Sequence, residues 1–291
     1  MSENHPLVGE VAGRPMVVTI DALDPSGASG LLANCRVVET LGCRSAGLVT
    51  ANWVADSSGV RRCEPVTAEV IGEQLPALFA DIEINAVLIG VLPSVAVASL
   101  VADAISQTSG TVIWNPRFMS RSGVALALDA PGRIGEEIGP QCDVITASVI
   151  EFAILGIAVD SVDKLGRAGT QWAKQFDTTV LAMGGDVPMP LGYVPSGDDS
   201  RSPPSFIANI LCQNDPDGQA NSGNKLDRQD FPMARRRGPY PRGLSATFSA
   251  ALACHLARSI DLDQAIERAQ SELESRWEKA APVGRGLPFL A

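Results

Sequence analysis

The sequence predicts an α/β protein in which helices pack against an open sheet of buried strands. Short β-branched runs, such as residues 17–20 and 111–114, alternate along the chain with stretches of helical periodicity such as 95–106. Hydrophobic residues make up 45% of the chain and aromatic residues only 5%, which fits buried strands with packed helices. At 291 residues, we expect one domain spanning residues 1–291.

The first strand, turn and helix organise the rest of the chain. Val17–Ile20 has the composition of a buried strand, and the Asp-Pro-Ser-Gly sequence that follows predicts a turn. A helix is expected to begin at Ser29 or Gly30. In open α/β sheets, ligands bind at the carboxyl ends of strands against a helix N-terminus, where Asp21 and Asp24 lie. The alternative is a plain connection, because the spacing fits neither the phosphate P-loop nor the dinucleotide fingerprint.

Charge and cysteine content argue against several classes of protein. The net charge of −10 disfavours nucleic acid or an anionic membrane as a partner. Six cysteines include no CxxC pair and only two histidines accompany them, so we expect scattered thiols and not a zinc site. The N-terminus lacks a signal-peptide pattern, and no apolar run reaches membrane-spanning length. We therefore expect a cytoplasmic protein.

The remaining elements follow from local pattern. Strands are expected at 45–51, 85–89, 111–114, 143–146, 178–183 and 206–211. Helices are expected at 95–106, 161–174 and 261–277, and after an N-cap at Thr67. Residues 230–234 are expected to pair with the last strand, interrupted by a disordered insert at 213–229. Residues 1–14 are expected to be a loose tail, and Arg235–Arg237 a solvated loop with phosphate contact as the alternative.

Two motifs carry a resemblance to a known family. Residues 24–36 read DPSGASGLLANCR, and residues 243–254 read GLSATFSAALAC. They closely resemble the DPSGGAGIQADLK and GTGCTLSAALAA motifs of hydroxymethylpyrimidine/phosphomethylpyrimidine kinases, thiamine-pathway members of the ribokinase-like superfamily. Shorter matches at 89–92, 184–185 and 283–288 extend the resemblance over nearly the whole chain.

The resemblance implies a fold, an activity and ligands. The expected fold is a ribokinase-like three-layer αβα sandwich with a mostly parallel central sheet. The expected reaction is phosphoryl transfer from ATP, with Mg²⁺, to a pyrimidine hydroxymethyl group or its phosphate. The substrate would be a small-molecule pyrimidine or a related heteroaromatic alcohol, and the resemblance also implies a homodimer.

Site residues follow from the resemblance, position by position. The substrate-binding positions are Ala22, Asp24, Asn34, Ala55 and Val91. The nucleotide-binding positions are Ser148, Glu151, Gly184, Gly185 and Thr247, and Glu151 is also expected to hold Mg²⁺ through water. The anion-hole loop that faces the transferring phosphoryl group corresponds to Gly243, Ser245 and Ala246, at a helix N-terminus.

Several polar residues of the family are replaced here. Ala246 stands where the family has its catalytic Cys, and Asn34 stands where it has the Asp that reads the pyrimidine. Met183 replaces the Lys that reaches phosphate, and Ala55 replaces a pocket Gln. These replacements leave Asp21, at the end of the first strand, as the candidate base.

Three functions remain open at this point. The chain is an active kinase that uses Asp21, a silent relative that binds a ligand or a protein, or a scaffold subunit whose partner supplies the chemistry. Loss of one base typically costs about 10²- to 10⁴-fold in rate, so the replacements alone do not exclude turnover. Asp21 in a closed pocket beside magnesium would favour an enzyme. Trp53 or Leu23 filling the pyrimidine space would favour the silent relative.

Overall fold

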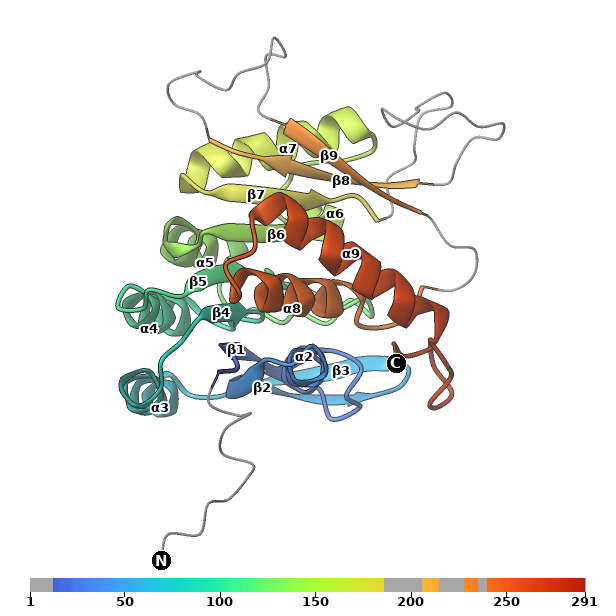
Figure 1. The fold of residues 1–291 in the computed structure, drawn as a ribbon. Coiled ribbons are helices and arrows are strands. Elements are labelled where there is room, and N and C mark those ends of the chain that lie inside the picture. The colour runs from blue at the N-terminus through green and yellow to red at the C-terminus, as the bar shows by residue number, and fades with distance from the viewer. Residues whose placement is uncertain (1–12, 186–205, 215–227, 235–239, 291) are drawn as a thin grey trace, which may run out of the picture.

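A nine-stranded sheet forms the centre of the computed structural model, which describes residues 13–185, 206–214, 228–234 and 240–290 (Figure 1). The strands are β1 (Met16–Leu23), β2 (Arg44–Asp56), β3 (Gly59–Pro65), β4 (Ala86–Ile89), β5 (Thr111–Trp114), β6 (Val144–Ser148), β7 (Thr179–Met183), β8 (Phe206–Cys212) and β9 (Arg228–Ala234). Their order is β3-β2-β1-β4-β5-β6-β7-β8-β9. The strands from β2 to β7 in this order are parallel, and β3, β8 and β9 pair antiparallel at the edges.

Helices cover both faces of this sheet. They are α2 (Gly30–Thr40), α3 (Ala68–Asp81), α4 (Val95–Ile105), α5 (Pro131–Ile138), α6 (Val149–Ile154), α7 (Val162–Phe176), α8 (Leu244–Leu256) and α9 (Leu262–Glu278). Buried residues of α2, α8 and α9 pack with one face of the sheet, and those of α3, α4, α5, α6 and α7 pack with the other (Figure 1). The expected three-layer αβα arrangement is confirmed.

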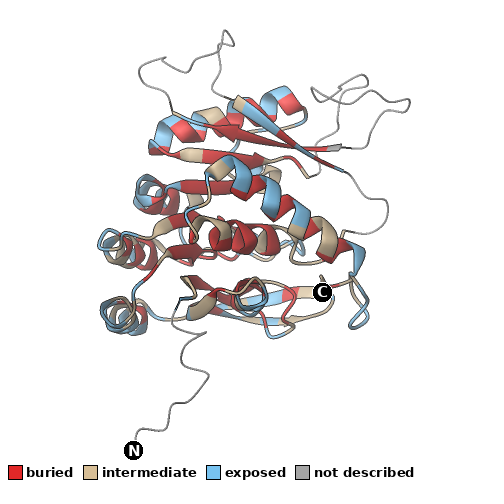
Figure 2. Ribbon diagram, viewed as in Figure 1, coloured by how far each residue is buried: buried red, intermediate tan, exposed pale blue. Residues whose placement is uncertain are grey.

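Alternation along the strands supplies both layers of the core. Val18 and Ile20 of β1 join one buried cluster, while Val17 joins the other. In β4, Val87 joins the cluster of Val18, and Leu88 joins that of Val17. Successive strand residues point to opposite faces of the sheet, which produces this alternation. Burying one such side chain contributes about 1.5–3 kcal/mol. Figure 2 shows the buried residues concentrated on the sheet and on the helix surfaces that face it.

Most predicted elements are confirmed. Helix α2 begins at Gly30 after an N-cap at Ser29, and the Thr67 side chain caps α3 by accepting the N–H of Val70. The expected pairing of β8 with β9 is confirmed, but β9 begins at Arg228, so Arg228 and Gln229 belong to the strand and not to the expected insert at 213–229. The sequence did not predict β3, α5 and α6. Residues Arg61–Glu64 of β3 carry no apolar alternation, and α5 and α6 are short enough to depend on tertiary packing.

Some expectations fall outside the described residues. Arg235–Arg237 lies there, as do most of the tail at 1–14 and most of the insert at 213–229. In the described ranges, no helix combines the length and apolar character needed to cross a membrane. The six cysteines form no disulfide, in agreement with the expected scattered thiols.

Candidate active site

A cavity of about 250 Å³ lies at the carboxyl ends of the parallel strands, where α/β sheets bind ligands. Its wall comes from the ends of β1, β4, β5, β6 and β7 and from the N-terminus of α8. Many of the site residues proposed from the sequence line it: Asp21, Asn34, Val91, Ser148, Gly185, Gly243, Ser245 and Ala246. Trp53 also lies on the wall, whereas Leu23 is not among the lining residues.

Asp21 is part of the cavity wall, and the residue is 6% exposed. Its Oδ1 accepts the backbone N–H groups of Ala22 at 2.7 Å and Val91 at 2.9 Å. Its Oδ2 accepts the amide of Asn34 at 3.0 Å. Burial raises the pKa of Asp21, while these hydrogen bonds and the charge of Arg117 lower it by less. Asp21 therefore binds its proton more tightly than an exposed aspartate.

Gly90 and Asn34 shape the surroundings of this carboxyl group. A Cβ at Gly90 would lie 2.2 Å from Cγ of Asp21, so only glycine leaves room for it. Asn34 Oδ1 is buried and has no hydrogen-bond partner. The bond from Asn34 Nδ2 to Asp21 turns this carbonyl oxygen away from the carboxylate. Buried acceptors are normally paired, so this end of the cavity suits a ligand with N–H or O–H donors.

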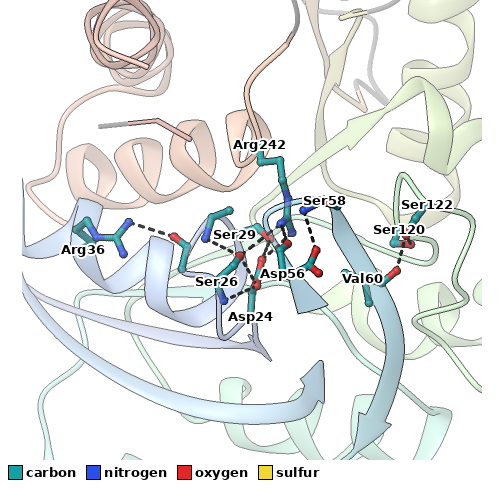
Figure 3. A network of polar contacts seen from close by, with 12 residues as sticks. Asp24, Ser26, Ser29, Arg36, Asp56, Ser58, Val60, Ser120, Ser122 and Arg242 are labelled. Atoms are coloured by element: carbon teal, nitrogen blue, oxygen red, sulfur yellow. Dashed lines mark hydrogen bonds and ion pairs between the residues drawn. The ribbon is translucent and has the colours of Figure 1, made fainter. Parts of the chain in front are cut away.

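Asp24 lies behind the cavity wall in a polar network that we call the clasp: Asp24, Ser26, Ser29, Asp56 and Arg242 (Figure 3). The Asp24 carboxylate is fully buried and pairs with Arg242 Nη2 at 2.9 Å. It also accepts the hydroxyls of Ser26 at 2.6 Å and Ser29 at 2.8 Å. Arg242 Nη1 donates to the carbonyl of Asp56, at the tip of the β2–β3 hairpin. The clasp therefore ties the β1–α2 turn to the segment before α8.

The expected anion-hole loop leads into the N-terminus of α8. Gly243 caps α8 with a φ of 89°, and a Cβ there would lie 2.2 Å from the carbonyl oxygen of Ala28. The first N–H groups of α8 have no carbonyl partner within the helix, and the helix dipole makes this end positive. Ser245 and Ala246 bring this end of the helix to the cavity wall.

Asn115, which directly follows β5, anchors that loop and was missed as a site residue. Its Nδ2 lies 2.6 Å from the hydroxyls of both Ser245 and Ser249, and 3.0 Å from that of Thr146. The Ser245 hydroxyl donates back to Asn115 Oδ1 at 3.1 Å. The strand-end argument that singled out Asp21 could also have found Asn115. This network fixes the anion-hole loop against β5 and β6.

Glu151, the expected magnesium residue, lies behind Ser148 and is 1% exposed. Its Oε2 accepts the Ser148 hydroxyl, and its Oε1 lies 3.6 Å from Nη1 of Arg117. Among the described residues, no group of three or more His, Cys, Asp or Glu side chains could hold a metal. The guanidinium that faces the Glu151 carboxylate offsets its negative charge and repels a divalent cation. The residues present do not fit a magnesium ion held by the protein at Glu151.

The other predicted positions lie outside the cavity wall: Ala22, Ala55, Gly184 and Thr247. Gly184 allows β7 to approach β8, since a Cβ there would lie 2.3 Å from the carbonyl oxygen of Ala208. Thr247 is buried within the first turn of α8, and its N–H donates to the carbonyl of Gly243. Met183, at the position of the family lysine, does line the cavity.

Comparison with known proteins identifies the family of this chain. The sequence model of the family described as phosphomethylpyrimidine kinase matches residues 24–201. The chain belongs to this family. It is 25% identical over 277 residues to the hydroxymethylpyrimidine/phosphomethylpyrimidine kinase of Rhizobium meliloti, covering 93% of this chain and 94% of that protein.

Solved structures of kinases share the fold. An ADP complex of Bacillus subtilis pyridoxal kinase superposes with a TM-score of 0.77 at 19% identity, covering 95% of this chain and 96% of that one. The phosphomethylpyrimidine kinase from Clostridium difficile gives a TM-score of 0.68 at 21% identity, covering 90% and 99%. The predicted ribokinase-like fold is confirmed.

Proposed function

We propose that this member of the phosphomethylpyrimidine kinase family is an active kinase. It transfers the terminal phosphoryl group of ATP to the hydroxymethyl group of a pyrimidine, to its phosphate, or to a related heteroaromatic alcohol. The observation that carries the proposal is a single cavity lined by both the Asp21 carboxyl group and the anion-hole loop. A nucleotide as donor is supported by the related pyridoxal kinase, which was solved with ADP.

Asp21 acts as the general base in this proposal. It accepts the proton of the substrate hydroxyl as that oxygen attacks phosphorus. Burial raises its pKa and so brings its basicity closer to the working pH, where proton transfer is most effective. The donors from Ala22, Val91 and Asn34 fix the orientation of the carboxylate. Ala246, at the position of the family's cysteine, carries no group that could accept the proton.

The anion-hole loop stabilises the phosphoryl group during transfer. Phosphoryl transfer depends mainly on positioning and on neutralising charge at the phosphoryl oxygens. The free N–H groups at the start of α8 are aimed at such an anion, and Asn115 holds Ser245 so that the loop keeps its shape. We assign no step to a magnesium ion bound by Glu151, because the surrounding residues do not fit one.

A silent relative or a scaffold subunit is less consistent with the cavity. A cavity of about 250 Å³ remains, and Trp53 is one of the residues that line it. Asp21 and Asn34 also place hydrogen-bond acceptors at the wall, and Asn34 Oδ1 has no hydrogen-bond partner. A site that has lost its function is not expected to retain buried polar groups, because each unpaired one lowers the stability of the fold.

Calorimetry followed by a transfer assay tests this function. Mg-ATP is titrated into the purified protein, hydroxymethylpyrimidine is titrated next, and the phosphorylated product is then sought by ³¹P NMR. We expect both ligands to bind and the pyrimidine phosphate to form. If neither ligand binds, the kinase proposal fails and a protein partner becomes the better explanation. If both bind but no product forms, the protein binds these ligands without acting as a kinase.

A further inference from the structure

Arg117 is a cation of the cavity that the proposed mechanism does not use. It follows β5, lines the cavity, and has a side chain that is 31% exposed. It lies 3.6 Å from Glu151 Oε1, and its charge also acts on Asp21. Within the described part of the chain, no hydrogen bond engages its N–H donors, so the pair with Glu151 holds the guanidinium without saturating it. An arginine has five such donors in a planar fork.

The other charged groups of the wall are placed differently. Arg242 also lines the cavity, but it is 10% exposed and bonded to Asp24 in the clasp. Arg121 lies farther along the same loop and is exposed. Met183 brings no charge at the position where the family has its phosphate-binding lysine. Among the described residues of this wall, Arg117 is thus the cation that has a buried partner and no hydrogen bond to its N–H donors.

The surroundings of Arg117 also place it near the phosphoryl end of the cavity. Asn115, two residues earlier, bonds to Ser245 in the anion-hole loop. Ser148, which donates to Glu151, lines the cavity as well. Phosphate oxygens would therefore meet the N–H groups of α8 on one side and a guanidinium on the other, an arrangement suited to bidentate contacts.

We propose that Arg117 binds the phosphates of the nucleotide donor and supplies the positive charge that Met183 and the Glu151 position do not. The proposal rests on the proposed kinase function. It has a consequence for metal dependence, because a fixed guanidinium neutralises phosphate charge without a divalent cation. Nucleotide binding should depend more on Arg117 than on a metal ion held by Glu151.

Calorimetric titration of AMP-PCP, with Mg²⁺ and with EDTA in its place, tests the proposal. The affinity of the wild type should fall less than about tenfold when EDTA replaces Mg²⁺. Arg117→Gln should bind at least about tenfold more weakly than the wild type in both buffers, which is the loss expected for one charge-assisted contact. The affinity of Arg117→Lys for AMP-PCP should lie between those of the wild type and Arg117→Gln, because lysine keeps the positive charge but lacks the planar fork of donors. Arg121→Gln, a matched change on the same loop, should have a smaller effect than Arg117→Gln.

The outcomes separate this inference from the kinase proposal. If the wild type binds AMP-PCP in neither buffer, both fail. If it binds and Arg117→Gln binds as well as the wild type, or Arg121→Gln loses as much, the assignment to Arg117 alone is overturned. Because Arg117→Gln leaves Glu151 buried and unpaired, the double variant Arg117→Gln/Glu151→Gln keeps the local charge balanced. A cooperative melting curve shows that this double variant is folded. It should then lose as much affinity for AMP-PCP as Arg117→Gln does, and wild-type affinity in the folded double variant would also overturn the assignment.

Discussion

The cavity wall buries the carboxylate of Asp21, from the end of β1, and the clasp buries that of Asp24, from the turn after β1, but the two carboxylates have different hydrogen-bond partners. In the clasp, Asp24 has a guanidinium at 2.9 Å and two serine hydroxyls, so both of its oxygens are paired. On the cavity wall, Asp21 has only neutral N–H donors within hydrogen-bond distance, and burial raises its pKa. Neither burial nor position in the chain separates the two residues.

The difference between them is the identity of the partners. A buried carboxylate with a cation partner is an internal ion pair that holds segments together. A buried carboxylate without one has a displaced pKa and remains available for proton transfer, a pattern that is enriched at functional sites. From this comparison we propose that Asp24 stabilises the fold and that Asp21 takes part in the chemistry. The predictions below test this division, beginning with the largest expected effect.

Breaking the clasp should cost the most stability. Arg242→Met leaves the fully buried Asp24 without its cation, and loss of one partner of a buried pair costs about 3–5 kcal/mol. The free energy of unfolding is measured in urea. Adding Asp24→Asn to the same chain should recover part of the loss, because no unpaired charge then remains.

Lys164→Ala is the matched control for that experiment. It removes an exposed ion pair with Asp160, in which the side chains are 50% and 67% exposed. Such pairs contribute less than about 1 kcal/mol. Similar small losses in Lys164→Ala and Arg242→Met would show that the clasp is not a structural pair.

Asn115→Leu should have an intermediate effect. It leaves the hydroxyls of Thr146, Ser245 and Ser249 without their shared partner, which costs about 1–3 kcal/mol when the groups are buried. Urea unfolding measures this loss. Asn115→Asp is the control, because its carboxylate can accept hydrogen bonds from the same hydroxyls, and it should remain closer to the wild type. Equal stability of Asn115→Leu and the wild type would contradict the anchoring role of Asn115.

The smallest effect concerns pH. Folding raises the pKa of Asp21, so the folded state binds this proton more tightly than the unfolded state does. The resulting contribution to the free energy of unfolding is fully present at low pH. It is lost as the pH rises from about 4, the ordinary aspartate pKa, through the raised value in the folded state. Asp21→Asn has no such charge, so wild-type stability should fall relative to this variant over that window. Each unit of pKa shift is worth about 1.4 kcal/mol.

Urea unfolding of both proteins across this pH range checks the sign. Asn34 is expected to rotate its amide in Asp21→Asn, since its free Oδ1 can then accept from the new side-chain amide. The variant should therefore stay folded at every pH. If the difference in stability between the wild type and Asp21→Asn does not change with pH, or changes in the opposite direction, then burial does not raise the pKa of Asp21.

The local pattern of the sequence was enough to predict the first βα unit, the N-cap of α3 at Thr67 and both carboxylates at the strand end. It could not separate Asp21 from Asp24, because the partner that decides the matter is remote. Arg242 lies 218 residues from Asp24 along the chain, and Ser245 lies 130 residues from Asn115. Such contacts are set by the sheet order and not by spacing in the sequence.

The replaced residues show the same limit. Alignment of motifs identified Ala246 and Met183 as losses, and these losses made a silent protein an open alternative. Position by position, the motifs could not show that Arg117 from the end of β5 faces Glu151. Compensation of this kind is visible only when several strand ends are seen together.

The most direct test of the division is phosphoryl transfer from ATP to hydroxymethylpyrimidine, measured side by side for Asp21→Asn and Asp24→Asn. Both are assayed at a temperature at which their melting curves show them to be folded. We predict that Asp21→Asn loses about 10²- to 10⁴-fold in kcat and melts near the wild type. Asp24→Asn should melt earlier, with its kcat within about threefold of the wild type. Full activity in Asp21→Asn, or a loss of kcat in folded Asp24→Asn as large as the one predicted for Asp21→Asn, would contradict the account.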